Sequence, residues 1–126
     1  MSKTITWFEI PAMDFERAVA FYENVLGGKI EVTEMGGNPY GFLPNYQEGV
    51  GGAITKWPDF RPAQNNTGVL VYFYAENLDE MLGRVERAGG KISTPKAFIN
   101  EEIGHYATIV DSEGNKIALH QPANQG

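Results

Sequence analysis

The sequence predicts an α+β fold of two tandem βαβββ modules, and two observations support this prediction. The four residues Gly-Gly-Lys-Ile occur at 27–30 and again at 89–92, almost half of the 126-residue chain apart, each time after a helical pattern. Each helical pattern also has one strand-like segment before it and three after it. One sheet with one helix leaves a face bare, so we expect the two sheets to curl into a partly open barrel, with the helices outside and a cleft within.

Two helices are predicted from the spacing of apolar residues. In residues 15–26 apolar side chains recur at steps of three and four, and Asp14 before them is a suitable N-cap. The same spacing predicts a second helix over 78–88, with Asn77 as its N-cap. Both patterns stop at a Gly-Gly pair, which is typical of a helix end.

The strands are predicted from short segments rich in aromatic and β-branched residues, separated by glycine and asparagine turns. We expect them at about 5–10, 29–35, 40–43 and 52–56 in the first half, and at about 69–75, 91–97, 106–111 and 116–120 in the second. The chain is then a single domain over 1–126. Module one covers about 1–57, a linker with two prolines about 58–67, and module two about 68–122.

Composition excludes several classes of function. The chain has no cysteine, which rules out disulfides, thiolate nucleophiles and cysteine-based metal sites. Its net charge of −6 argues against nucleic acid or an anionic membrane as the main partner, because both attract positive patches. No apolar run approaches the roughly 20 residues that span a membrane, and residues 1–6 lack the apolar core of a signal peptide. We therefore expect a cytoplasmic protein.

Alternation along the strands predicts which side chains face the cleft. If Phe8 and Ile10 pack under the first helix, Trp7 and Glu9 point into the cleft. The same rule in the second module turns a further set of side chains toward it: Leu70, Tyr72, Tyr74, Ala118 and His120.

Four segments resemble the vicinal oxygen chelate superfamily, which includes glyoxalase I, extradiol dioxygenases and the fosfomycin- and bleomycin-resistance proteins. These are Trp-Phe-Glu-Ile-Pro at 7–11, the two runs 14–18 and 21–27, and the closing run 111–119, which is similar to the pattern D-P-x-G-x-x-x-E-L. The opening and the Ile-Ala-Leu-His ending resemble a glyoxalase-related branch of undefined substrate. The resemblance implies the two-module fold and a homodimer.

The resemblance also implies a divalent metal held by one ligand from each of four strands, and the sequence departs from that pattern. The corresponding positions here are Trp7, Ala53, Leu70 and Ala118. None of them has a donor atom suited to a divalent metal. We therefore predict that the metal site of the enzymatic members is absent, and we expect no cofactor.

Two ionisable residues near those positions are the candidate catalytic groups. Glu9 and His120 each lie two residues beyond a position carried over from the family, which keeps the cleft-facing side but moves about 7 Å along the strand. They could act as base and acid, bind a polar head group, or form a buried pair that only shapes the cavity. Trp7, Leu70, Tyr72 and Tyr74 are the candidate ligand-binding residues, with Tyr40 and Phe42 as weaker ones.

Three functions are compatible with these residues. We favour a protein that binds a small organic molecule in the cleft without a metal, similar to the drug-sequestering members of the bleomycin-resistance branch. The alternative is a metal-independent isomerase or lyase that acts on a carbonyl compound through Glu9 and His120. A module that chiefly binds another protein is the third possibility.

Overall fold

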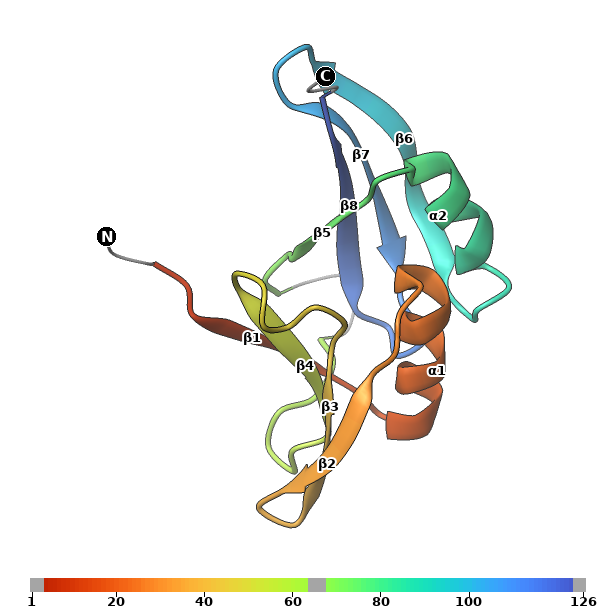
Figure 1. Ribbon diagram of the computed structural model, residues 1–126. Coiled ribbons are helices and arrows are strands. Elements are labelled where there is room, and N and C mark those ends of the chain that lie inside the picture. Colours follow the sequence, from red (N-terminus) through yellow and green to blue (C-terminus); the bar gives the residue numbers. More distant parts are fainter. Residues whose placement is uncertain (1–3, 64–67, 124–126) are drawn as a thin grey trace.

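The computed structural model describes residues 4–63 and 68–123, which form two four-stranded sheets with one helix each (Figure 1). Module one contains β1 (Trp7–Pro11), α1 (Phe15–Leu26), β2 (Glu31–Met35), β3 (Asn38–Phe42) and β4 (Gly51–Thr55). Module two contains β5 (Tyr72–Tyr74), α2 (Leu78–Val85), β6 (Lys91–Asn100), β7 (Gly104–Val110) and β8 (Lys116–Pro122). The α+β fold of two βαβββ modules is therefore confirmed.

Helix α1 begins and ends where its sequence pattern predicts. The Asp14 side chain accepts a hydrogen bond from the backbone N–H of Arg17 at 3.1 Å, so it caps the first turn. Gly27 ends the helix in a left-handed conformation with φ of 78°, which a residue without a Cβ adopts at little cost. The apolar stripe of the helix is buried: Phe15, Ala18, Phe21, Tyr22 and Val25.

Helix α2 is shorter than predicted. Asn77 caps it by accepting from the backbone N–H of Glu80 at 3.1 Å, but the regular helix ends at Val85 rather than at Ala88. The chain then continues in a tighter turn, in which the N–H of Ala88 is shared between the carbonyl oxygens of Arg84 and Val85. The apolar spacing continues through this turn, which is why the sequence pattern overestimated the helix.

Each sheet has the same topology, with one parallel strand pair. The strand orders are β1-β4-β3-β2 and β5-β8-β7-β6, where β1 runs parallel to β4 and β5 parallel to β8. Strand β5 is shorter than expected, because only residues 72–74 form the ladder at this sheet edge. Strand β6 is longer, and its register with β7 shifts between Thr94 and Ala97, around Pro95, which has no N–H to donate.

The two sheets meet through side chains at their edges and are not closed into a barrel. The rings of Phe8 in β1 and Phe73 in β5 lie 6.0 Å apart, and Phe73 also contacts Tyr22 of α1 at 5.9 Å. The helices lie next to each other on one side of the two sheets (Figure 1), and their apolar faces share one core with Ile54 and Leu119. The opposite face of each sheet carries no helix.

A buried carboxylate joins the two modules. Glu113, in the turn between β7 and β8, has a fully buried side chain and accepts hydrogen bonds from the backbone N–H groups of Met13 and Asp14 at 2.8 and 2.7 Å. Its other partners are the Arg17 guanidinium, at 2.7 and 3.0 Å, and the Ser112 hydroxyl. The charge therefore lies at the amino end of α1, where the helix dipole and the free N–H groups favour an anion.

The same turn makes a second polar connection. Asp111 is buried and accepts from the Tyr22 hydroxyl at 2.6 Å, while Asn115 donates to the carbonyl oxygen of Pro11 at 2.8 Å. Burial, with the charge and hydrogen bond of Asp111, raises the pKa of Tyr22 well above its usual value. The turn at 111–115 thus holds both the end of β1 and the middle of α1.

Within the described residues, no helix is long and apolar enough to cross a membrane.

We predict that Glu113→Ala lowers the free energy of unfolding by about 2–4 kcal/mol, because it leaves Arg17 and the backbone N–H groups of Met13 and Asp14 without their carboxylate partner. Burial alone would raise the pKa of Glu113, but hydrogen bonds from Arg17, Asp14 and Ser112, and the Arg17 charge, lower it overall. The charged form therefore stabilises the folded protein at neutral pH, and this contribution should disappear as the pH falls below about 4.5.

Urea unfolding of wild type and Glu113→Gln at pH 7 and in acid measures this contribution. The difference between the two proteins should shrink in acid, and Glu16→Gln, at an exposed position of the same helix, serves as the control. A difference that stays constant with pH would contradict the assignment.

Candidate functional site

The helix-free face of the first sheet carries the predicted residues Trp7 and Glu9. Alternation places Phe8 and Ile10 on the helix side, where Ile10 is buried in the core, and the other two on the open side. Glu9 lies opposite Ala53 in the parallel pair of β1 and β4. Trp7 and Glu9 thus lie on the face of the first sheet that carries no helix.

Glu9 is held by two hydrogen bonds from aromatic side chains. Its Oε2 accepts from the Tyr40 hydroxyl at 2.8 Å, and its Oε1 accepts from Trp57 Nε1 at 2.7 Å. The Tyr40 oxygen in turn accepts from Trp7 Nε1 at 2.8 Å. Three aromatic donors from β1, β3 and the segment after β4 thus fix the position of one carboxylate.

Tyr40 and Trp57 bond to this carboxylate, and ring contacts join them to three further aromatic residues. We call the five residues the Glu9 aromatic cluster: Trp7, Tyr40, Phe42, Tyr46 and Trp57. Neighbouring ring centroids are 4.6–6.3 Å apart. Gly51 makes the cluster possible, because a Cβ at this position would lie 2.9 Å from the Trp7 ring and 2.2 Å from the backbone oxygen of Tyr46. These rings gather on the open face because Gly51 and Ala53 leave room above β4.

Glu9 brings a negative charge to the cluster, and no positive side chain of the described residues is paired with it. No lysine, arginine or histidine among residues 4–63 and 68–123 forms an ion pair with Glu9. Burial, together with the hydrogen bond and charge of Glu9, raises the pKa of Tyr40, so this hydroxyl stays neutral and donates to the carboxylate. Beside them, Thr55 is fully buried opposite Tyr40, and its hydroxyl has no hydrogen-bond partner in the described structure.

The predicted residues of module two lie on the other sheet. Tyr72 and Tyr74 are 56% and 67% exposed, and they line a cleft of about 400 Å³ with the loop that precedes β4. Leu70 is exposed just before β5. His120 pairs with Tyr74 in the ladder, and its Nε2 lies 2.8 Å from the carbonyl oxygen of Ile103. Glu9 and His120 are thus held by different partners on different sheets.

Sequence reasoning underestimated part of the aromatic cluster. Tyr40 and Phe42 were weaker candidates, whereas Tyr46 and Trp57 were not predicted at all. Trp57 follows the alternation of Ala53 and Thr55 along and beyond β4, and this periodicity is the signal that identifies it. Trp57 lies at the border of the predicted linker, so the strand alternation was not extended to it.

The positions that hold a metal in the resembling enzymes do not fit one here. Ala53 and Ala118 are fully buried and offer only methyl groups, and Trp7 and Leu70 have no suitable donor atom. Among residues 4–63 and 68–123, no three or more histidine, cysteine, aspartate or glutamate side chains are placed to hold a metal ion. The donor set therefore does not support metal chemistry at this site.

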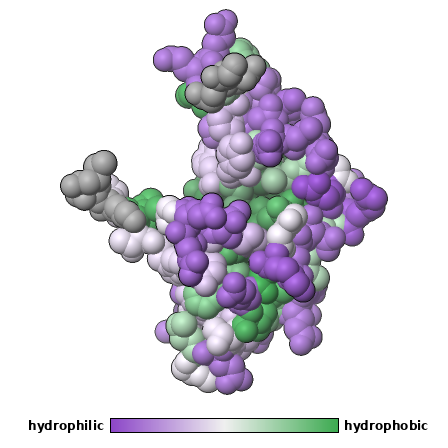
Figure 2. Space-filling view, in the orientation of Figure 1, coloured by the Kyte–Doolittle hydropathy of each residue, from purple (hydrophilic) through white to green (hydrophobic). Residues whose placement is uncertain are grey.

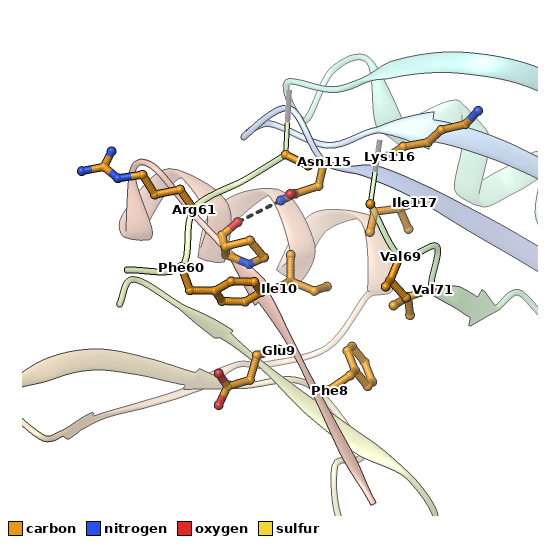
Figure 3. A pocket seen from close by; sticks show the side chains of 13 residues that line it. Phe8, Glu9, Ile10, Phe60, Arg61, Val69, Val71, Asn115, Lys116 and Ile117 are labelled. Carbon is orange, nitrogen blue, oxygen red and sulfur yellow. Dashed lines mark hydrogen bonds between the residues drawn. The ribbon is translucent and has the colours of Figure 1, made fainter. Parts of the chain in front are cut away.

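An apolar cavity of about 450 Å³ lies beside the site, where β1 passes the start of β8 (Figure 3). Its walls include Phe8, Ile10, Phe60, Val69, Val71 and Ile117. Figure 3 shows the Glu9 carboxylate turned to the other side of β1, with Arg61 and Lys116 pointing away from the cavity. Glu9 is nevertheless among the residues that line the cavity, so its side chain borders both the hydrophobic cavity and the polar site.

The surface is mainly hydrophilic in this view, with apolar residues gathered where the modules meet and on the lower module (Figure 2). The outline is hollowed between the upper module and the start of β1, on the side away from the helices.

Comparison with known protein families and sequences finds one matching family and a relative. The profile of the Glyoxalase/Bleomycin resistance protein/Dioxygenase superfamily matches residues 4–119. A glyoxylase-like domain-containing protein from Didymella fabae is 25% identical over 91% of this chain and 91% of its own length.

Solved structures share the fold. A glyoxalase/bleomycin resistance protein from Albidiferax ferrireducens has a TM-score of 0.73 and 19% identity over 94% of this chain and 99% of its own. An antibiotic-binding protein from a Streptomyces species has a TM-score of 0.69 and 21% identity, covering 97% and 98%. The genomically encoded fosfomycin resistance protein from Listeria monocytogenes has a TM-score of 0.69 and 17% identity, covering 98% and 96%.

We predict that mildly purified protein carries no stoichiometric transition metal or zinc, because the four inherited positions lack ligands. Plasma mass spectrometry of the purified chain tests this. Near one equivalent of metal per chain, lost in Glu9→Ala or His120→Ala, would overturn the prediction.

Proposed function

Because the chain belongs to the Glyoxalase/Bleomycin resistance protein/Dioxygenase superfamily, we propose that it binds a small organic molecule on the open face of its sheets without a metal. Glu9 and the Glu9 aromatic cluster form the centre of the proposed site. Leu70, Tyr72, Tyr74 and His120 on the second sheet are proposed to contact the more distant parts of the ligand. One structural relative is an antibiotic-binding protein, which is consistent with a binding role on this fold.

The observation that carries the proposal is a half-buried carboxylate among aromatic rings that has no cationic partner in the described structure. Partial removal of a charge from water is unfavourable unless hydrogen bonds or an opposite charge compensate. A purely structural position would be served at lower cost by a neutral side chain. Such costs are common where a protein keeps a group for binding.

Binding is favoured over catalysis because no observation brings an acid and a base to one substrate. An isomerase or lyase mechanism would require Glu9 and His120 to act on the same molecule. Glu9 bonds to Tyr40 and Trp57, and His120 contacts the Ile103 carbonyl. Turnover of a carbonyl compound that stops in both Glu9→Gln and His120→Gln would revive the alternative.

We also propose that two chains form a homodimer through the exposed apolar residues of module two. Several large side chains there are open to solvent: Val69, Tyr72, Tyr74, Phe98, Ile99 and Ile103. A second copy that covers them would remove apolar surface from water and enclose the cleft beside Tyr72 and Tyr74.

The ligand-binding proposal predicts a fluorescence response confined to one place in the molecule. Trp7 and Trp57 are the only tryptophans, and both donate into the Glu9 network. A compound that binds there should change tryptophan fluorescence and raise the melting temperature in a screen of carbonyl compounds and aromatic drugs.

Glu9→Gln should keep the melting temperature equal or higher but abolish both responses, because it keeps the shape of the side chain and removes its charge. If Glu9→Gln melts several degrees lower yet binds the wild-type ligand equally well, the role of Glu9 is structural.

The dimer proposal predicts about twice the 13.9 kDa chain mass in sedimentation equilibrium at micromolar concentration. Tyr74→Glu should shift the equilibrium to monomer, whereas Glu16→Gln on the helix side should not. A wild-type chain that stays monomeric at high concentration would rule the dimer out.

A further inference from the structure

We propose that the ligand of the Glu9 site is an organic cation, with a quaternary or tertiary ammonium group placed among the aromatic rings and beside the carboxylate. This inference rests on the proposed function and names the chemical class of its ligand. Three features of the site support it: the charge of Glu9, the direction of its hydrogen-bond donors and the aromatic walls.

The carboxylate of Glu9 has unused capacity to interact with a positive group. It accepts one hydrogen bond on each oxygen, whereas an ionised carboxylate offers about four acceptor positions. The ion pairs formed by described residues all lie elsewhere, between Arg17 and Glu113, Arg84 and Glu80, and Lys96 and Asp79. The charge of Glu9 is therefore available to a ligand.

The donor groups around Glu9 are already engaged within the site. Trp7 Nε1 donates to Tyr40, and both the Tyr40 hydroxyl and Trp57 Nε1 donate to Glu9. An anion or a carbonyl oxygen would need these donors, and binding it would break a bond to the carboxylate. A quaternary ammonium group needs no hydrogen-bond donor, so it can bind beside Glu9 without breaking these hydrogen bonds.

The rings provide the remaining attraction. The face of an aromatic ring is electron-rich and attracts a cation within about 6 Å of its centroid. The plane of Trp7 makes angles of 71° and 86° with those of Phe42 and Tyr46. Phe42 and Tyr46 lie 4.6 Å apart at 30°, so their rings are nearly stacked and Trp7 stands across both. The ammonium group is proposed to lie against the ring faces that these contacts leave open.

The proposal is tested with the full chain and pairs of probes that differ in charge but not in shape. Choline and 3,3-dimethylbutan-1-ol have the same outline, with nitrogen replaced by carbon, and pivalate supplies an anion of similar bulk. Benzyltrimethylammonium adds an aromatic group for a larger site. Each is titrated at constant ionic strength against tryptophan fluorescence, which reports on Trp7 and Trp57 alone.

We expect choline to bind at least about tenfold more tightly than 3,3-dimethylbutan-1-ol, the ratio that corresponds to ~1.4 kcal/mol. Glu9→Gln should weaken the cation by a similar factor. Glu86→Gln, which removes the same charge from the exposed end of α2, should leave it unchanged. The comparison of probes on wild-type protein remains decisive even if Glu9→Gln folds poorly.

Equal binding of the cations and the alcohol, or tighter binding of pivalate, would overturn the inference. If neither cation binds but a neutral compound from the wider screen gives a Glu9-dependent fluorescence change, the cation inference fails while the proposed binding function stands. If nothing in either set binds, both fail.

Discussion

The arrangement of the two modules depends on the buried carboxylate of Glu113. It comes from the last hairpin of module two, yet its partners are the backbone N–H groups of Met13 and Asp14, just before α1, and the guanidinium of Arg17 in module one. A buried charge is tolerated only when its hydrogen bonds are satisfied, so the turn and the helix must stay in contact. Asp111 and Asn115 extend the same contact to Tyr22 and to the end of β1. The helix side of the molecule is therefore fixed by polar groups as well as by its apolar core.

The Glu9 site is built differently, because all of its parts come from module one. Strand β1 supplies Glu9 and Trp7, strand β3 supplies Tyr40, and Trp57 follows β4. Main-chain pairing of these strands sets the spacing of the side chains, so the site does not depend on the junction between modules for its geometry. Glu113 therefore acts on the contact between the modules, whereas Glu9 lies in a network confined to module one.

The fold keeps the architecture of its superfamily while the inherited ligand positions carry other chemistry. Ala53 and Ala118 fill their positions with methyl groups, and Trp7 occupies a third with an indole that bonds to Tyr40. The nearest carboxylate lies two residues farther along the strand, at Glu9, where hydrogen-bond donors stabilise it.

The sequence by itself determined the repeated modules, the cap of each helix and the open-face position of Glu9. These features follow from short-range rules, such as helical spacing, capping by Asp14 and Asn77, and strand alternation. Only the tertiary structure decided which side chains meet. Glu9 contacts Tyr40 and Trp57, which are 31 and 48 residues away, and not the imidazole of His120. Pairing of β3 and β4 creates those contacts, and strand register is a long-range property that local sequence patterns do not encode.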